Sequence, residues 1–225
     1  MVPWVLLGTA NVPDGGELRL MQRGQEFSIR LGRIELMNSR MHGSEDALAT
    51  LARAKLRDRA KPRILIGGLG MSFTLRATLD AFGAEAQVVV AELVPAVVTW
   101  NRGPLADLAG QALADARVRV RVGNVVEAIR AERAAWDAIL LDVDNGPDAL
   151  TSAGNNRLYT PEGLRATHAA LRPGGVLAVW SAGPERSFTP RLRQAGFTAE
   201  EIPVRARGER RGARHVIWLA ISPAR

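Results

Sequence analysis

The sequence predicts an α/β protein with a doubly wound, mainly parallel sheet, preceded by a small antiparallel β segment. From Lys61 onward, apolar strand-like runs alternate with helix-like segments, which is typical of right-handed β-α-β crossovers. Before residue 44, short runs of period-two alternation are separated by closely spaced turn residues, which is typical of a β meander. The expected units are therefore a meander at 1–43 and a Rossmann-like unit at 44–225.

The meander should have four strands, and a helix should follow it. The strands are expected at 4–10, 17–23, 26–31 and 33–39, with glycine-containing turns between them. The helix pattern covers 43–60. Ser44 is its expected N-cap, and Glu45 and Asp46 fall in the first turn, where acidic residues complement the helix dipole.

The Rossmann-like unit should contain a seven-stranded sheet. Parallel strands are expected at 63–68, 87–93, 117–123, 136–143 and 174–181, and helices at 72–82, 95–101, 124–133, 161–171 and 187–195. Two further strand patterns, at 197–206 and 213–222, are joined by a polar loop that contains glycine. They predict an antiparallel C-terminal hairpin at the sheet edge.

Composition excludes several kinds of site. The chain has no cysteine, which rules out disulfides, thiolate nucleophiles and cysteine-bound metal. Its three histidines are widely spaced, so no metal site is expected. The net charge of +7 comes almost wholly from arginine, and apart from 205–214 the arginines are scattered. A solvated basic face is favoured over a nucleic-acid site, which stays an open alternative.

No membrane segment is expected, because the longest apolar runs are strand-sized and a bilayer requires roughly 20 residues. The opening MVPWVLLGTA has no basic residue ahead of its apolar run and resembles a first strand more than a signal peptide. We therefore expect a cytoplasmic protein.

Ligands of doubly wound sheets bind at the carboxyl ends of the strands, and two motifs there indicate a nucleoside. The first strand runs into Gly67, Gly68 and Gly70, although Phe73 replaces the third glycine of the dinucleotide fingerprint. Glu92 ends the next strand, 92 − 70 = 22 residues beyond Gly70, a distance that suits hydrogen bonds to ribose hydroxyls.

Polar residues also follow the third and fourth strands. Asn124 begins a helix, where an adenine contact and a plain N-cap are equally good interpretations. In LLDVDNGPD, Asp142 ends a buried strand at the expected mouth of the site, so a functional role is favoured over turn-shaping. For Asp144 the two interpretations are balanced, and Asp148 is better explained as a solvated loop residue.

This order of motifs resembles the spermidine synthase family of the class I S-adenosylmethionine-dependent methyltransferase fold, over most of the chain. In that family the fourth strand ends in an aspartate, a short acidic Gly-Pro loop follows, and a Tyr-containing helix leads into a Pro-Gly-Gly type of turn. Asp142, Gly146, Pro147 and Tyr159 match this pattern.

The resemblance implies a co-substrate, decarboxylated S-adenosylmethionine or S-adenosylmethionine, and a role for each matched residue. Gly67, Gly68 and Gly70 would hold its amino-acid end, Glu92 its ribose, and Asn124 with Val125 its adenine. Asp142 would be the catalytic aspartate that orients an amine and helps to remove its proton, with Asp144 as the second carboxylate. The resemblance also implies a homodimer.

The acceptor is less defined, because the chain departs from the family in three places. The spacing between the two family aspartates, Asp142 and Asp144 here, is shorter than in the family. The segment MNSRMHGSEDALATL lacks the family's polyamine pattern, and GGLGMS has no acidic residue where the family has one. His42, Asp46 and Tyr159 are candidates for contact with a small-molecule amine or other acceptor, each with a structural alternative. The leading hypothesis is aminopropyl transfer. The alternatives are an S-adenosylmethionine-dependent methyltransferase, a non-catalytic nucleoside-binding or RNA-binding protein and, more distantly, a nicotinamide-dependent dehydrogenase.

Overall fold

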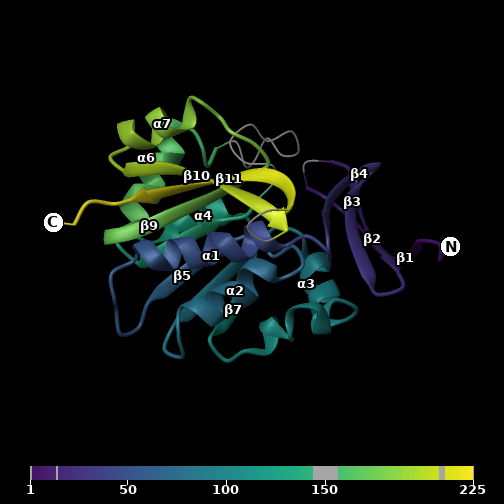
Figure 1. Cartoon of the computed structure of the whole chain (residues 1–225). Coiled ribbons are helices and arrows are strands. Elements are labelled where there is room, and N and C mark those ends of the chain that lie inside the picture. The colour runs from purple at the N-terminus through teal and green to yellow at the C-terminus, as the bar shows by residue number, and fades with distance from the viewer. Residues whose placement is uncertain (1, 14, 144–156, 208–210, 225) are drawn as a thin grey trace.

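The computed structural model describes residues 2–13, 15–143, 157–207 and 211–224. They form two sheets, one of four strands in the order β1-β2-β3-β4 and one of seven in the order β10-β11-β9-β8-β5-β6-β7. The four-stranded sheet lies beside α3 at one end of the molecule (Figure 1). The C-terminal strands β10 and β11 belong to the seven-stranded sheet. This arrangement confirms the predicted fold class.

The N-terminal sheet is an antiparallel meander, as predicted. Its strands are β1 (Val5–Asn11), β2 (Glu17–Arg23), β3 (Glu26–Leu31) and β4 (Ile34–Asn38). Leu18, Leu20 and Ile29 are buried and belong to the same apolar cluster as the main sheet. A Cβ added to Gly8 would lie 2.8 Å from the indole nitrogen of Trp100 on α3, so β1 approaches that helix closely. The meander is therefore packed onto the Rossmann-like unit.

The main sheet combines parallel strands with an antiparallel hairpin. Its strands are β5 (Arg63–Gly67), β6 (Gln87–Glu92), β7 (Val118–Val122), β8 (Trp136–Leu141), β9 (Leu171–Ser181), β10 (Thr198–Arg207) and β11 (Arg211–Ile221). The first five pair in parallel, whereas β11 runs antiparallel between β9 and β10. All six residues of β8 are buried, as expected for a central strand covered on both faces.

Helices cover both faces of the main sheet. On one face lie α1 (Gly43–Lys55), α2 (Phe73–Ala81) and α3 (Pro95–Arg102), and on the other α4 (Val125–Ala131), α6 (Pro161–Ala170) and α7 (Phe188–Gln194). Two short 3-10 helices, η1 (Ala106–Ala109) and η2 (Ala112–Ala114), precede β7. Within the described ranges, none of the helices has the length and apolar character that crossing a membrane requires.

Three local predictions need correction. The Ser44 N-cap is wrong, because α1 begins at Gly43 with His42 at the N-cap position, and no side chain caps the helix. Ser44 lies inside the first turn, and its hydroxyl donates to the carboxylate of Glu45 instead. The helix also ends at Lys55, before the predicted limit of 60. In β9, the Arg-Pro-Gly-Gly segment belongs to the strand, which starts at Leu171 and is irregular in register before Val176.

A buried carboxylate ties the early part of β8 to two arginines. The side chain of Asp137 is fully buried, and it forms ion pairs of 2.8 Å with Arg59 and 2.8 Å with Arg172. It also accepts the backbone N–H of Arg63 at 2.8 Å, at the start of β5. This cluster lies at the amino end of β8, whereas Asp142 follows its carboxyl end.

The strand order places four strand ends side by side. Strands β5, β6 and β7 follow one another toward one edge of the sheet, whereas β8 and β9 are added on the other side of β5. The strand order therefore reverses between β5 and β8, and open α/β sheets bind ligands at such a point. Backbone hydrogen bonds join the residues just past these ends: Asp142 N–H to Gly67 O at 3.0 Å, Gly68 N–H to Ala91 O at 2.9 Å, and Gly123 N–H to Glu92 O at 2.9 Å. The segments after β5, β6, β7 and β8 therefore meet at one edge.

Candidate functional site

A cavity of about 420 Å³ opens where these strand ends meet the N-terminal sheet. Its floor includes residues that follow β5, β6, β7 and β8, and its apolar walls include Leu18, Ile29 and Leu31 of the N-terminal sheet. Cavities of this size hold small-molecule ligands in other proteins. The hairpin closes another side through His215.

The glycine turn after β5 allows the backbone to approach both the cavity and β8. Gly68 has a φ of +88°, and a Cβ added there would lie only 2.4 Å from the carbonyl oxygen of Asp142. Gly70 has a φ of +51°, and its added Cβ would meet the sulfur of Met37 at 2.8 Å. Both glycines line the cavity. Gly67 is not among the described lining residues and packs against Val125 instead.

Glu92, the predicted ribose ligand, is buried at the cavity wall. Its carboxylate accepts the backbone N–H of Leu69 at 2.9 Å and that of Val94 at 2.8 Å. One acidic side chain thus fixes both the glycine turn and the start of α3. The structure places Glu92 at the cavity wall and shows that it has a structural role; contact with a ribose stays a prediction.

Asn101 is a second residue, after Glu92, whose side chain stabilises the glycine turn by hydrogen bonds, and the sequence did not predict it. Its side-chain amide donates to Gly70 O at 2.8 Å, and its carbonyl oxygen accepts the hydroxyl of Ser72 at 2.8 Å. Ser72 has a φ of +63°, so the turn contains a non-glycine residue in the left-handed region. Only the three-dimensional packing of α3 on the turn reveals this role.

Asn124 and Val125, which the resemblance assigns to adenine, both line the cavity. Asn124 is also the N-cap of α4, because its side-chain oxygen accepts the backbone N–H of Val126 at 2.9 Å. The two interpretations of Asn124 are therefore compatible, since the same residue caps the helix and faces the cavity.

Asp142 lines the cavity beside the glycine turn. The hydroxyl of Thr74, in the first turn of α2, donates to its carboxylate at 2.6 Å. Burial raises the pKa of Asp142, and the hydrogen bond from Thr74 offsets part of that rise.

Glu45 is a second cavity carboxylate that sequence reasoning assigned only to a helix-dipole position. It is 8% exposed, and burial together with the charge of Asp142 raises its pKa from 4.5 to about 7. The Ser44 hydroxyl donates to its carboxylate at 2.6 Å and lies 3.2 Å from Nδ1 of His215, which also lines the cavity. Burial lowers the pKa of His215. Helix α1 and strand β11 thus meet at this corner.

The three candidate acceptor residues do not line the cavity within the described part of the chain. His42 and Asp46 pair with each other at 2.7 Å, Asp46 also pairs with Arg76 at 2.8 Å, and the His42 ring stacks on Phe73. Tyr159 is 1% exposed and lies in the apolar cluster beneath α6 and α7. Asp144 and Asp148 lie outside the described residues.

The cavity is acidic. Its described lining contains the four carboxylates of Glu35, Glu45, Glu92 and Asp142, together with His215, but no lysine or arginine. Among the described residues, no group of three or more His, Asp or Glu side chains is arranged to hold a metal ion. The site therefore offers negative charge, apolar walls and a backbone turn that admits close approach.

Comparison with known proteins supports the same architecture. No protein-family model and no curated protein sequence matches the chain. Among solved structures, it is similar to a spermidine synthase in complex with the transition-state analogue AdoDATO, with a TM-score of 0.80 and 16% identity over 98% of this chain and 74% of that one.

Two further structures extend the comparison. A spermidine synthase from Thermotoga maritima gives a TM-score of 0.77 at 16% identity, again over 98% of this chain and 74% of that one. A putative O-methyltransferase from Klebsiella pneumoniae gives 0.54 at 22% identity, over 80% of each chain. The chain therefore has the class I methyltransferase fold. More specifically, its fold is spermidine-synthase-like, because the similarity extends over the N-terminal meander as well.

Proposed function

We propose that this protein is an S-adenosyl-dependent transferase that moves an aminopropyl group from decarboxylated S-adenosylmethionine to an amine. The observation that carries the proposal is the acidic cavity at the switch point of a spermidine-synthase-like fold. Gly68 and Gly70 would admit the donor chain, Glu92 would bind the ribose, and Asn124 with Val125 would flank the adenine.

Charge favours the decarboxylated donor. That donor carries a sulfonium and an ammonium group and no carboxylate, whereas S-adenosylmethionine also carries a carboxylate. A donor carboxylate would lie in a cavity whose described lining has four acidic side chains and no lysine or arginine. Burying a charge without a partner is costly, and like charges repel more strongly at low dielectric.

The chemistry requires an unprotonated amine held in line with the carbon bonded to sulfur. The nitrogen lone pair forms the new N–C bond as the C–S bond breaks. The electron pair of the broken C–S bond stays on sulfur and converts the sulfonium into the thioether of methylthioadenosine. The proton lost from nitrogen passes to the carboxylate of Asp142, which faces the cavity and has a raised pKa. Positioning and proton removal together supply the catalysis.

A comparison of donors tests this proposal. Calorimetry should show that decarboxylated S-adenosylmethionine binds at least about tenfold more tightly than S-adenosylmethionine, a difference of about 1.4 kcal/mol. Incubation with that donor and putrescine should release methylthioadenosine, and Asp142→Asn should abolish this release. Equal or tighter binding of the carboxylated donor would instead favour a methyltransferase, in line with the similarity to an O-methyltransferase structure and with Leu69 where the family has an acid.

We also propose that the protein forms a homodimer through its N-terminal sheet. Val5 and Leu6 on edge strand β1 and Ile34 on edge strand β4 are 54%, 51% and 60% exposed, and apolar side chains of this size on sheet edges favour association. Sedimentation should give a dimer of 24.3 kDa chains, and Leu6→Lys should shift it to a monomer. A monomeric wild-type protein at micromolar concentration would contradict this.

A further inference from the structure

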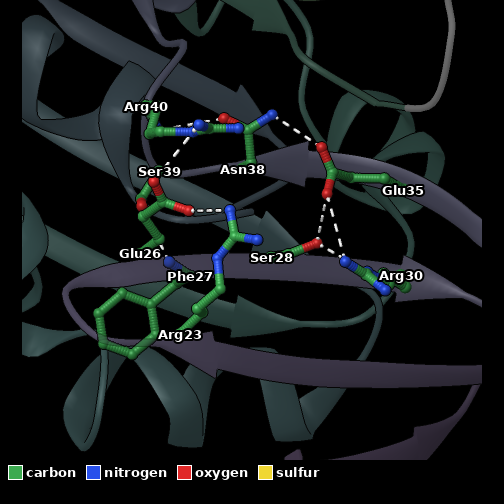
Figure 2. A network of polar contacts seen from close by, with 9 residues as sticks. All are labelled: Arg23, Glu26, Phe27, Ser28, Arg30, Glu35, Asn38, Ser39 and Arg40. Carbon is green, nitrogen blue, oxygen red and sulfur yellow. Dashed lines mark hydrogen bonds and ion pairs between the residues drawn. The ribbon is translucent and has the colours of Figure 1, made fainter. Parts of the chain in front are cut away.

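The four cavity carboxylates differ in what neutralises them. Glu35 is fully engaged in the N-terminal sheet, where its two oxygens accept the Ser28 hydroxyl and the Asn38 amide, each at 2.8 Å (Figure 2). It also lies 3.8 Å from the guanidinium of Arg30. Glu92 is satisfied in part by two backbone N–H groups. These two acids are held by the fold.

Glu45 and Asp142 have no cationic partner among the described residues. Their side-chain hydrogen bonds come from the neutral hydroxyls of Ser44 and Thr74, and Glu45 also accepts its own backbone N–H. No described lysine or arginine pairs with either carboxylate. The neighbouring acid on α1, Asp46, is by contrast paired with Arg76 and His42. Two buried carboxylates without a counterion are stable only when they hold a proton or a bound cation.

We propose that Glu45 and Asp142 form a paired carboxylate subsite that holds one proton when empty and exchanges it for the alkylammonium group of the acceptor. Glu45 is thus a second substrate-contacting acid beside Asp142, and the acceptor class is an alkylamine whose hydrocarbon part packs on Leu18, Ile29 and Leu31. The inference rests on the proposed function, because it assigns the acceptor end of the same cavity.

The surroundings of Glu45 support such an exchange. Its pKa of about 7 places the exchange near neutral pH. Burial and the charge of Asp142 raise this pKa, hydrogen bonds from the Ser44 hydroxyl and the backbone N–H of Glu45 lower it, and the charge of Asp46 on the same helix also raises it. The Ser44 hydroxyl lies 3.2 Å from Nδ1 of His215 on β11. A cation within about 4–6 Å lowers a carboxyl pKa by one to three units. The incoming ammonium therefore drives the shared proton off the pair and leaves two carboxylates around one positive charge.

The experiment is an NMR pH titration of protein labelled with ¹³C at the glutamate carboxyl carbon. Glu45 is assigned by backbone correlation, so the wild-type titration stands even if Glu45→Gln fails to fold. The protein is saturated with methylthioadenosine and titrated with and without n-butylammonium chloride. We expect the Glu45 midpoint near 7 to fall by at least about one pH unit with the amine, and sodium chloride at equal concentration to leave it in place.

Three variants sharpen the test. Glu45→Gln should weaken n-butylammonium binding at least about tenfold while leaving methylthioadenosine affinity unchanged. Asp46→Asn is the matched control on the same helix, because Asp46 lies outside the described cavity lining, and it should retain amine binding. Asp142→Asn should lower the Glu45 midpoint without any amine, because the charge of Asp142 helps to raise it.

The inference is overturned if Glu45 titrates near 4.5 in the empty protein, if its midpoint does not move with the amine, or if n-butylammonium does not bind. These outcomes are distinct from failure of the proposed function, which is decided by donor preference and methylthioadenosine release. A protein that prefers the decarboxylated donor but leaves Glu45 unmoved would keep the transferase proposal and remove the paired subsite.

Discussion

Replacement of Gly68 by alanine tests whether the glycine turn and Asp142 form one unit. The added Cβ would lie 2.4 Å from Asp142 O, a backbone atom that can move only if the end of β8 moves. The residue also has a φ of +88°, where a side chain costs about 1–3 kcal/mol. Overpacking against a fixed neighbour adds about 1–3 kcal/mol. The expected total loss of unfolding free energy is therefore about 2–6 kcal/mol.

Gly83→Ala is the matched control, because Gly83 has a φ of +78° and no atom within 4 Å of an added Cβ. This variant has the strain of a side chain at positive φ but no steric clash, so its unfolding free energy should fall by only about 1–3 kcal/mol. Urea denaturation measures both values, and calorimetry with methylthioadenosine measures binding. We expect Gly68→Ala to lose at least about tenfold in affinity and Gly83→Ala to lose none. Equal losses of stability in the two variants, with unchanged nucleoside binding in both, would refute the close contact between the glycine turn at Gly68 and the end of β8 at Asp142.

Four further predictions concern single side chains. Glu92→Ala removes the acceptor of two buried backbone N–H groups and should cost about 2–5 kcal/mol in urea denaturation; a loss below about 0.5 kcal/mol would contradict the bracing role. Because the pKa of Glu45 rises from 4.5 to about 7 on folding, the folded state keeps a proton that the unfolded chain loses. Unfolding free energy should therefore fall by up to about 3 kcal/mol between pH 4.5 and 7 through Glu45, and the fall should be smaller in Glu45→Gln, where the raised pKa of Asp142 remains. Asp137→Ala should cost about 3 kcal/mol, because two arginines lose a buried partner, whereas Glu162→Ala, which breaks an exposed pair, should stay within about 0.5 kcal/mol. Asn124→Ala should cost about 1 kcal/mol through the lost N-cap and Asn124→Ser much less; equal values would show that the cap is immaterial.

The fold could be predicted from the sequence because its strands and helices have distinct periods. Buried strands such as β8 are continuous apolar runs, which is typical of a parallel sheet covered on both faces. The meander strands alternate apolar and polar residues, which is typical of an antiparallel sheet with one buried face. The errors lie at ends. Ser44 has the chemistry of an N-cap, but its hydroxyl is used by Glu45, and the helix begins one residue earlier. Tertiary contacts of this kind leave no trace in local sequence.

The site was predictable where it depends on the topology. Glu92 ends a strand, and Gly68, Asn124 and Asp142 come just after strands. The carboxyl ends of neighbouring parallel strands lie at one edge of the sheet, so the convergence of these residues follows from the strand order. Glu45 reaches the cavity by a different route. It depends on how α1 packs beside β11, where Ser44 contacts a residue 171 positions away. No period or spacing in the sequence indicates such a contact. The sequence therefore predicted acceptor contacts for His42 and Asp46 and not for Glu45.

The sign of the cavity charge is opposite to that of the chain as a whole, and the pairing of side chains accounts for this. The sequence holds 30 basic and 23 acidic residues, a balance that favours phosphate-bearing partners when it is counted over the whole chain. Most of the described ion pairs, such as Arg76 with Asp46, place arginines on acids that lie outside the cavity lining. The carboxylates of Glu45 and Asp142 line the cavity without a lysine or arginine among its described lining residues. Under the proposed function, this lining selects a positively charged ligand although the chain as a whole carries a net positive charge.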